Sequence, residues 1–307
     1  MTDMDYTAAQ DAFFQPRDAA APPQTGPPSA ARALRDAMEA IATISFWARP
    51  VYDRLEAFGL NFLTGYVWGR GSALGAPDGR VVAAAFGAFE PGLITTLYDE
   101  ARGHCTHAQI RQALSDGVVE ALTDVLGNDA AVTQDVTDAV ATLRRGVDAT
   151  DGFGRALTAG LLAQPWPTEP LAELWHACAI LREFRGDNHL AACVTAGLDG
   201  PTSNILTERM IGWEPLAYTA TRGWSPEVMQ AGTDRLVAQG RLEGSGLSAA
   251  GTEFRHGIEQ ITERSMTGVV AAIGDDLDAL VHRLDGWSQA IIERGWFPPD
   301  PYKRAAG

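Results

Sequence analysis

The feature that most constrains the fold is the order of helix signals and glycine turns between residues 225 and 264. Ser225-Pro226-Glu227 reads as an N-cap, a first helical residue and a first-turn acid, and Gly240 stops the helix that follows. Residues 241–247 then form two very short strands around a glycine turn, and Ser248 caps another helix. A helix, a small wing and a capped helix in this order predict a winged helix.

The motif that follows the wing supports this prediction. Leu247-Ser248-Ala249-Ala250-Gly251 has the form L-S-x-x-G. It resembles the equivalent stretch of MarR-like winged helices, and the resemblance is confined to the region around the wing. It implies a winged-helix fold for this half and offers a MarR-like transcriptional regulator as one alternative for the function.

The charge of this region argues against DNA binding. Residues 171–264 hold 12 Asp or Glu against 8 Arg, and the whole chain carries a net charge of -15. A helix that reads the major groove needs cations beside the phosphates and donors aimed at the bases. The candidate recognition helix instead carries Glu227, Gln230, Thr233, Asp234 and Arg235. DNA is therefore a disfavoured partner.

Composition and periodicity predict a mainly α protein. The 307 residues, 46% of them hydrophobic, suffice for two domains. We expect a disordered arm over 1–28, an N-terminal helical domain over 29–164, a winged-helix domain over 169–264, and a C-terminal helix and tail over 265–307. Two tandem winged-helix-like domains are the predicted architecture, the first of them without a clear wing, and a diverged internal duplication is one possible origin for the pair.

The duplication rests on one shared order of motifs. Asp78 before a small-residue helix leads to Phe89-Glu90-Pro91 in the first half, and Asp187 leads to Trp213-Glu214-Pro215 in the second. An Arg-Gly pair and an amphipathic helix follow in both. Chance similarity in an alanine-rich chain is the competing interpretation.

Two further motifs carry a family resemblance. Leu174–Ala192 reads L-W-H-A-x-x-x-L-R-E-x-R-G-D-x-H-x-A-A, and Gly65–Gly75 reads G-Y-x-x-G-R-x-x-x-L-G. Both resemble signatures of SalK-like actinobacterial proteins, and an arginine-rich composition with one lysine, Lys303, fits such a genome. The resemblance implies a helical protein with a winged-helix half, encoded near specialised metabolism. Phe184 stands where members often carry another histidine, which puts any site built on three histidines in doubt.

The same motifs supply the candidate site. The ligand-binding candidates are aromatic or ionisable side chains from both segments: Tyr66, Trp68, Arg70, Trp175, Arg182, Arg185 and Asp187. His176 and His189 are the catalytic candidates if the protein is an enzyme, because a histidine beside a carboxylate titrates near neutrality and suits proton transfer. A cleft is expected where segment 65–75 meets the end of the 175–189 helix.

A purely structural interpretation of these residues stays open. In it, Asp187 caps the next helix, His189 lies in the first turn of that helix, and Arg182 or Arg185 pairs with a carboxylate. Arg70 either binds an anion or forms an internal ion pair with an acidic residue of the second domain.

The sequence lacks the motifs of common metal sites and of phosphate-binding loops. His104-Cys105-Thr106-His107 has no second pair of ligands for zinc, and the glycine segment lacks the lysine of a phosphate loop. We therefore predict no metal and no cofactor. Cys105, Cys178 and Cys193 fit a reducing cytoplasm, and no signal peptide, membrane span or membrane partner is expected.

Two classes of function remain. The first is a winged-helix protein that binds or senses a small-molecule ligand. The second is a cofactor-free enzyme of specialised metabolism that uses its histidines for proton transfer and its arginines to hold an anion. The amphipathic segment 275–294 adds a homodimer through the C-terminal helix as a further expectation.

Overall fold

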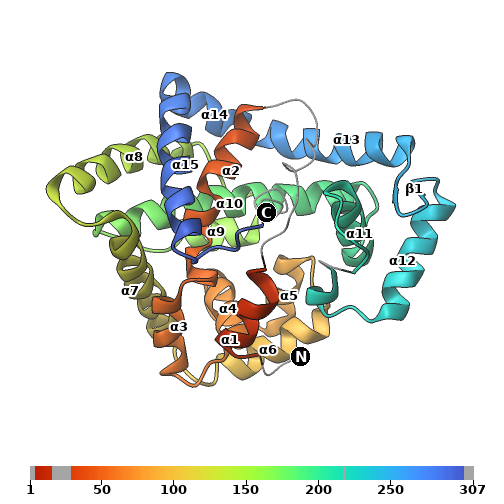
Figure 1. Cartoon of the computed structure of the whole chain (residues 1–307), viewed down its shortest axis with the longest axis horizontal. Coiled ribbons are helices and arrows are strands. Elements are labelled where there is room, and N and C mark those ends of the chain that lie inside the picture. Colours follow the sequence, from red (N-terminus) through yellow and green to blue (C-terminus); the bar gives the residue numbers. More distant parts are fainter. Residues whose placement is uncertain (1–3, 16–28, 217–218, 301–307) are drawn as a thin grey trace.

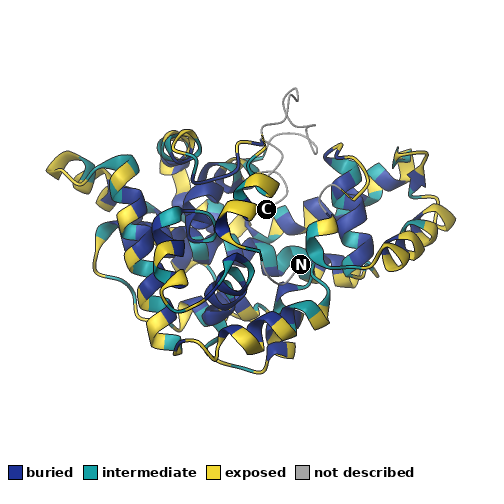
Figure 2. Ribbon diagram, turned by 60° about the horizontal axis from the view of Figure 1, so that its bottom comes forward, coloured by how far each residue is buried: buried dark blue, intermediate teal, exposed yellow. Residues whose placement is uncertain are grey.

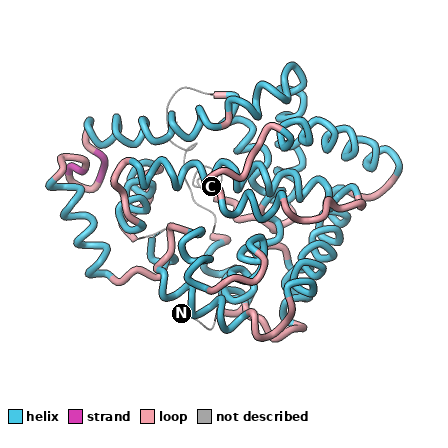
Figure 3. Tube along the Cα trace, turned by 180° about the vertical axis from the view of Figure 1, so that it is seen from behind, coloured by secondary structure: helices cyan, strands magenta, loops and turns pink. Residues whose placement is uncertain are grey.

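The computed structural model describes residues 4–15, 29–216 and 219–300. Within these ranges the regular secondary structure consists of helices and one two-stranded hairpin, joined by loops (Figures 1 and 3). The predicted mainly α fold is confirmed, and the strands lie in the predicted wing.

The described part of the first half contains nine α-helices and two 3-10 turns: α1 Tyr6–Phe13, α2 Ala30–Ala42, η1 Ile44–Phe46, α3 Arg49–Glu56, α4 Phe62–Gly71, η2 Ser72–Leu74, α5 Gly79–Phe86, α6 Pro91–Ala101, α7 His107–Leu126, α8 Ala130–Asp148 and α9 Ala156–Leu162. The second half contains α10 Pro170–Thr195, α11 Gly200–Met210, η3 Thr219–Arg222, α12 Pro226–Ala238, β1 Leu242–Glu243, β2 Gly246–Leu247, α13 Ala249–Ser265, α14 Thr267–Ile273, η4 Gly274–Asp276 and α15 Leu277–Glu293.

Helix α10 is the centre of the molecule. Glu169 caps it by accepting from the Ala172 amide, and Pro170 occupies its first turn. Its apolar residues Leu174, Ile180 and Leu181 are buried in the large core, which also contains residues of the first half and residues 266–297 (Figure 2). The boundary expected near residue 169 therefore lies in a loop within one continuous core.

The C-terminal helix α15 packs along α2 (Figure 1). Leu277, Leu280, Leu284 and Ile291 of α15 are buried in the same core, and the buried Ser288 hydroxyl donates to the Ala37 carbonyl at 2.6 Å. The apolar stripe that suggested a homodimer is thus covered by the chain itself. A dimer through α15 would have to use the opposite face of this helix.

Helices α11, α12 and α13 and the hairpin form the winged helix at one end of the molecule (Figure 1). Leu206, Met229, Leu236 and Leu242 are members of its small separate core. Gly232 lies where α12 meets α11, and a Cβ there would stand 3.1 Å from Ile205 Cδ1. This close approach explains a glycine inside a helix that it otherwise weakens.

Three local expectations are wrong. Residues 6–13 of the arm form helix α1, and the Tyr6 hydroxyl donates to the Trp47 carbonyl at 2.6 Å. The remainder of the expected disordered arm, residues 1–3 and 16–28, lies outside the described residues. Asp187 lies inside α10, whereas Asp78 caps α5. The first step of the proposed duplication therefore has no structural counterpart. The first half has no wing in its described residues, as the sequence led us to expect.

A steric constraint explains why the last residue of the L-S-x-x-G motif, Gly251, has no side chain. Ser248 caps α13 by accepting from the Gly251 amide at 2.9 Å, and its own amide donates to the Arg241 carbonyl at 3.1 Å. A Cβ on Gly251 would stand 1.9 Å from that carbonyl oxygen. The motif therefore lets the start of α13 lie directly against the segment that enters the wing.

We predict that Gly251→Ala lowers the free energy of unfolding by about 1–3 kcal/mol, because the backbone of Arg241 must move away. The matched control is Gly257→Ala in the same helix, where a Cβ meets nothing within 4 Å. It should raise stability by about 0.5–1 kcal/mol through helix propensity. Chemical denaturation of both variants checks the pair, and equal effects would contradict this role for Gly251.

Candidate functional site

A cavity of about 130 Å³ lies where α1, α2, α4 and α10 meet the segment before α12. We call it the aromatic cavity, and its lining residues are Phe13, Glu39, Thr43, Phe46, Trp47, Phe62, Leu63, Tyr66, Phe89, Arg182, Thr221, Arg222 and Phe297. More than half of these side chains are aromatic, so the walls favour a flat apolar molecule.

The aromatic residues form two walls. On one side Phe13 packs against Phe62 with ring centroids 6.0 Å apart and meets Trp47 edge-on at 5.7 Å. On the other side Tyr66 meets Phe46 edge-on at 5.1 Å and packs near Phe89 at 6.0 Å. Mutual packing of this kind holds the rings in place before any ligand arrives.

A second cavity of about 180 Å³ adjoins the first. The two share Tyr66, Phe89, Arg182 and Arg222. We call it the neighbouring cavity, and its other lining residues are Arg70, Phe86, Ala88, Gly186, His189, Leu190, Cys193, Ser203, Asn204 and Thr207. The candidate site is thus a pair of adjacent spaces. The first half, α10 and the connection between α11 and α12 line both, and α11 itself lines the second.

An alternating chain of charges lies beside both cavities. Arg70 donates twice to the Glu183 carboxylate, at 2.8 and 2.9 Å, and Arg182 donates to Glu183 at 2.9 Å and to Glu39 at 3.0 Å. Burial alone would raise the pKa of Glu183, but Arg70 and Arg182 outweigh it and hold the pKa below its usual range. Of the two alternatives for Arg70, the structure contains the internal ion pair.

Glu39 is the incomplete end of this chain. Its side chain is buried, with 3% of its surface exposed, and its Oε1 accepts from Arg182. Its Oε2 is also buried and has no hydrogen-bond partner among the described residues. Burial raises the pKa of this carboxyl, with Arg182 opposing the shift. A buried acceptor without a partner is costly, so this atom marks a place where a donor is needed.

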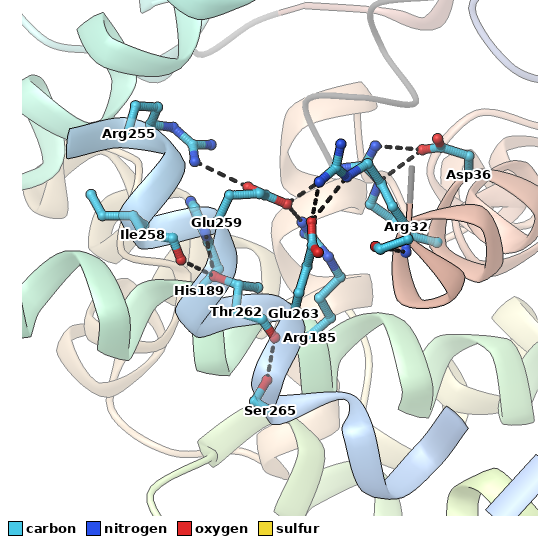
Figure 4. Close-up of polar contacts among 12 residues, drawn as sticks. Arg32, Asp36, Arg185, His189, Arg255, Ile258, Glu259, Thr262, Glu263 and Ser265 are labelled. Carbon is cyan, nitrogen blue, oxygen red and sulfur yellow. Dashed lines mark hydrogen bonds and ion pairs between the residues drawn. The ribbon is translucent and has the colours of Figure 1, made fainter. Parts of the chain in front are cut away.

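A second ionic cluster joins α10 to the winged helix (Figure 4). Glu259 of α13 accepts from Arg185 of α10 and, at 3.0 Å, from Arg255, and Arg35 of α2 lies 3.7 Å from it. Burial would raise the pKa of Glu259, but Arg185 and Arg255 hold it well below the usual range. Glu259 therefore links α2, α10 and α13, and Arg185 is the residue by which α10 joins this cluster.

The two catalytic candidates lie in different surroundings. His189 lines the neighbouring cavity, and its Nδ1 lies 3.1 Å from the Thr262 hydroxyl of α13. His176 lies outside both cavities, edge-on to Trp166. Burial, then the positive charge of Arg255 and Arg185, lowers the pKa of His189 to about 3.

Burial, with Arg111 and Arg144, lowers the pKa of His176 to about 4. The near-neutral titration expected for a pocket histidine is therefore wrong for both residues. Each is neutral at pH 7, and His176 lies beside arginines rather than beside the carboxylate that acid-base catalysis would use.

The remaining candidates have structural partners. The Trp175 indole donates to the Ala42 carbonyl at 3.2 Å, and Asp187 accepts from the Thr158 amide and hydroxyl at 3.0 and 2.8 Å. Trp68 is buried edge-on against Tyr98 at 5.2 Å, away from both cavities. Of the predicted ligand-binding residues, only Tyr66, Arg70 and Arg182 line the two cavities.

The glycine segment has a different role from the one expected. Residues 62–71 are helix α4, and its glycines let other helices approach. A Cβ on Gly65 would stand 3.0 Å from Leu55, and one on Gly71 would stand 3.0 Å from Tyr98. These glycines therefore bring α4 close to α3 and α6, and only Tyr66 and Arg70 of the segment reach the cavities.

No group of three or more metal-ligating side chains occurs in the part of the chain that the structure describes. His104 Nδ1 lies 3.1 Å from the Phe58 carbonyl, and His107 Nε2 lies 2.9 Å from the Ser72 carbonyl. The two histidines of the His-Cys cluster thus fasten loops.

The segment after α5 fastens the winged helix to the first half. The Ala88 carbonyl accepts from the Asn204 side chain at 2.7 Å and from the Trp224 indole at 3.0 Å, and the Glu90 amide donates to the Arg222 carbonyl at 2.8 Å. Phe89 and Arg222, which line both cavities, belong to this contact. The site therefore touches the connection between α11 and α12.

Sequence reasoning missed Glu39, Phe46, Phe89 and Arg222. Phe89 and the Arg-Gly pair that contains Arg222 were noted only as parts of a suspected repeat, and Glu39 was not singled out. A carboxylate on the buried face of α2 was the one available signal, because charged residues are rarely buried without a partner. The aromatic walls come from segments far apart in the chain, and no local pattern marks them.

The exposed face of α12 has few cations. Its Arg235 is paired with Asp199 at 2.6 Å, and Glu227, Val228 and Asp234 are exposed beside it. The hairpin adds Glu243 and no cation.

Comparison with known protein families matches residues 31–298 to a helix-turn-helix family. This covers most of the chain, so the protein belongs to that family. No curated protein and no solved structure matched the chain. Within the described residues, no helix combines the length and apolar character needed to cross a membrane.

We predict that stability falls as pH drops from 6.5 towards 4. The unfolded chain takes up protons on His176 and His189 near pH 6.5, while the folded protein keeps both neutral to about pH 4 and 3. As the pH falls through this window, each histidine should therefore lower the free energy of unfolding by about 1.4 kcal/mol per pH unit. Urea denaturation between pH 7 and 4.5 measures the slope.

Replacement of His176 by Gln should remove its share of that slope. The control is His282→Gln at an exposed position of α15, which should leave the pH dependence as it is. A slope that is identical in wild type and His176→Gln would show that His176 is not held neutral by the fold.

Proposed function

We propose that this helix-turn-helix protein binds a small molecule in the aromatic cavity and that the bound molecule acts on the position of the winged helix. The observation that carries the proposal is the composition of the cavity wall. Phe13, Phe46, Phe62 and Tyr66 come from the first half, whereas Arg222 belongs to the connection into α12. A molecule in this space touches both parts at once.

Two contacts support a coupled response. Arg222 lies with its guanidinium carbon 4.5 Å from the Phe89 ring centroid, so a ligand that displaces Phe89 disturbs the segment that leads directly into α12. Arg182 and Arg185 lie one turn apart on α10, and they bind Glu39 beside the cavity and Glu259 in α13. A shift of α10 against α2 therefore reaches the helix that follows the wing.

We predict that Leu63→Trp abolishes ligand binding. Leu63 is partly buried in the cavity wall, and an indole there fills a space of about 130 Å³. Native mass spectrometry of protein purified from its host detects a retained molecule in the wild type and its loss in the variant. The matched control is Leu162→Trp at an exposed site, which should retain the ligand. Retention by Leu63→Trp would place the ligand elsewhere.

A MarR-like transcriptional regulator is the second candidate, and family membership favours it. The surface of α12 argues for weak binding, since its Arg235 is already paired with Asp199. We predict that DNA from the protein's own upstream region is retarded only at low salt and without sequence preference. A gel-shift titration from low to physiological salt measures this. Nanomolar, sequence-dependent retardation at physiological salt that is lost in Arg235→Ala would contradict the prediction.

The alternative of a cofactor-free enzyme has less support, because neither His176 nor His189 has the near-neutral pKa of an acid-base group. The resemblance to SalK-like proteins fits a ligand from specialised metabolism under either candidate function.

A further inference from the structure

The size of the two cavities limits the ligand. A dry cavity of about 150 Å³ accommodates one benzene ring, and the aromatic cavity is close to that size at about 130 Å³. The neighbouring cavity, about 180 Å³, begins at the shared residues Tyr66 and Phe89. A molecule of two fused rings would fill the first space and extend into the second.

The charges beside the aromatic cavity limit the polarity of the ligand. In the chain from Arg70 through Glu183 and Arg182 to Glu39, two cations alternate with two carboxylates. Arg70 and Arg182 already donate to Glu183 and Glu39, so an anionic ligand group would have to break an existing pair to bind either arginine. An uncharged molecule disturbs this chain least.

One atom of this chain of charges lacks a hydrogen-bond donor, and a ligand group could supply it. Glu39 Oε1 accepts from Arg182 Nε at 3.0 Å, which holds the carboxylate beside a cation. The Glu39 side chain lines the aromatic cavity, and its Oε2 is buried with no donor from the described residues. A hydroxyl on the ligand would supply the missing donor, and a charge-assisted bond of this kind is among the stronger hydrogen bonds.

We propose that the aromatic cavity binds a flat, uncharged, fused-ring phenol whose hydroxyl donates to Glu39 Oε2. This inference rests on the proposed function in one respect only, since it needs the aromatic cavity to be the ligand site. It adds the chemical class of the ligand and makes Glu39 the residue that selects it.

Three naphthalene probes test the proposal by fluorescence titration of the full chain. 2-Naphthol donates and accepts, 2-methoxynaphthalene only accepts, and 2-naphthoate is anionic. We expect 2-naphthol to bind the wild type about tenfold more tightly than 2-methoxynaphthalene, and 2-naphthoate to bind more weakly than 2-naphthol.

Glu39→Gln should reverse the preference for a donor. The amide oxygen can still accept from Arg182, while the amide nitrogen replaces Oε2 by a donor. The tenfold advantage of 2-naphthol should then disappear, and 2-methoxynaphthalene should bind at least as well. Glu120→Gln, at the exposed carboxylate that pairs with Arg54, is the charge-matched control and should keep the wild-type preference.

The outcomes separate this inference from the proposed function. Equal binding of 2-naphthol and 2-methoxynaphthalene to the wild type, blocked by Leu63→Trp, would overturn the phenol assignment and leave the cavity as the ligand site. Tighter binding of 2-naphthoate would overturn it in favour of an anionic ligand held by arginine. If no probe binds and no ligand is retained, both proposals fail.

Discussion

The charged contact between α2 and α10 is the interaction on which the rest of the structure depends. Helix α10 is buried along most of its length, yet its middle carries Arg182, Glu183 and Arg185. Taking such groups out of water costs several kcal/mol each unless every one finds a partner. Glu39, one turn after Arg35 on α2, meets Arg182, and Arg35 lies near the Glu259 carboxylate that Arg185 binds. Sliding α2 by one turn would leave several charges unpaired, so we interpret this contact as the element that fixes the register of the core.

The same contact has two ends with different neighbours. One end, at Glu39, borders the aromatic cavity, and the other, at Glu259, belongs to the helix after the wing. Both ends are held by arginines on adjacent turns of one rigid helix. A charge that changes its partner at the first end alters the Coulomb energy at the second, because the dielectric screening between buried groups is weak. The fold thus provides a physical connection between a cavity and a winged helix, without requiring a hinge or a disordered segment.

Sequence patterns were sufficient where the cause of the structure is local. The caps at Ser225 and Ser248, the stop at Gly240 and the two short strands all depend on residues close in the chain, and each is present. Asp187 shows the limit. An aspartate after glycine looks like a cap, but the buried Thr158 amide and hydroxyl satisfy its carboxylate, so α10 continues through it. The aromatic cavity also depends on tertiary contacts, so local sequence patterns could not predict it. Its walls combine α1, α2, α4 and a segment near residue 222, and only tertiary packing brings them together.

Family membership and surface chemistry give different information about the winged helix. The family match and the hairpin establish the shape of a helix-turn-helix unit, and shape alone does not fix what the unit binds. On α12, Arg235 is committed to Asp199, while Val228 and Val237 are exposed and offer no hydrogen bonds to base edges. Elsewhere in this unit, Asn204, Trp224 and Glu259 hold it against the first half and α10 by hydrogen bonds. These polar contacts of the unit therefore lie at its junction with the first half and α10, away from the exposed face of α12.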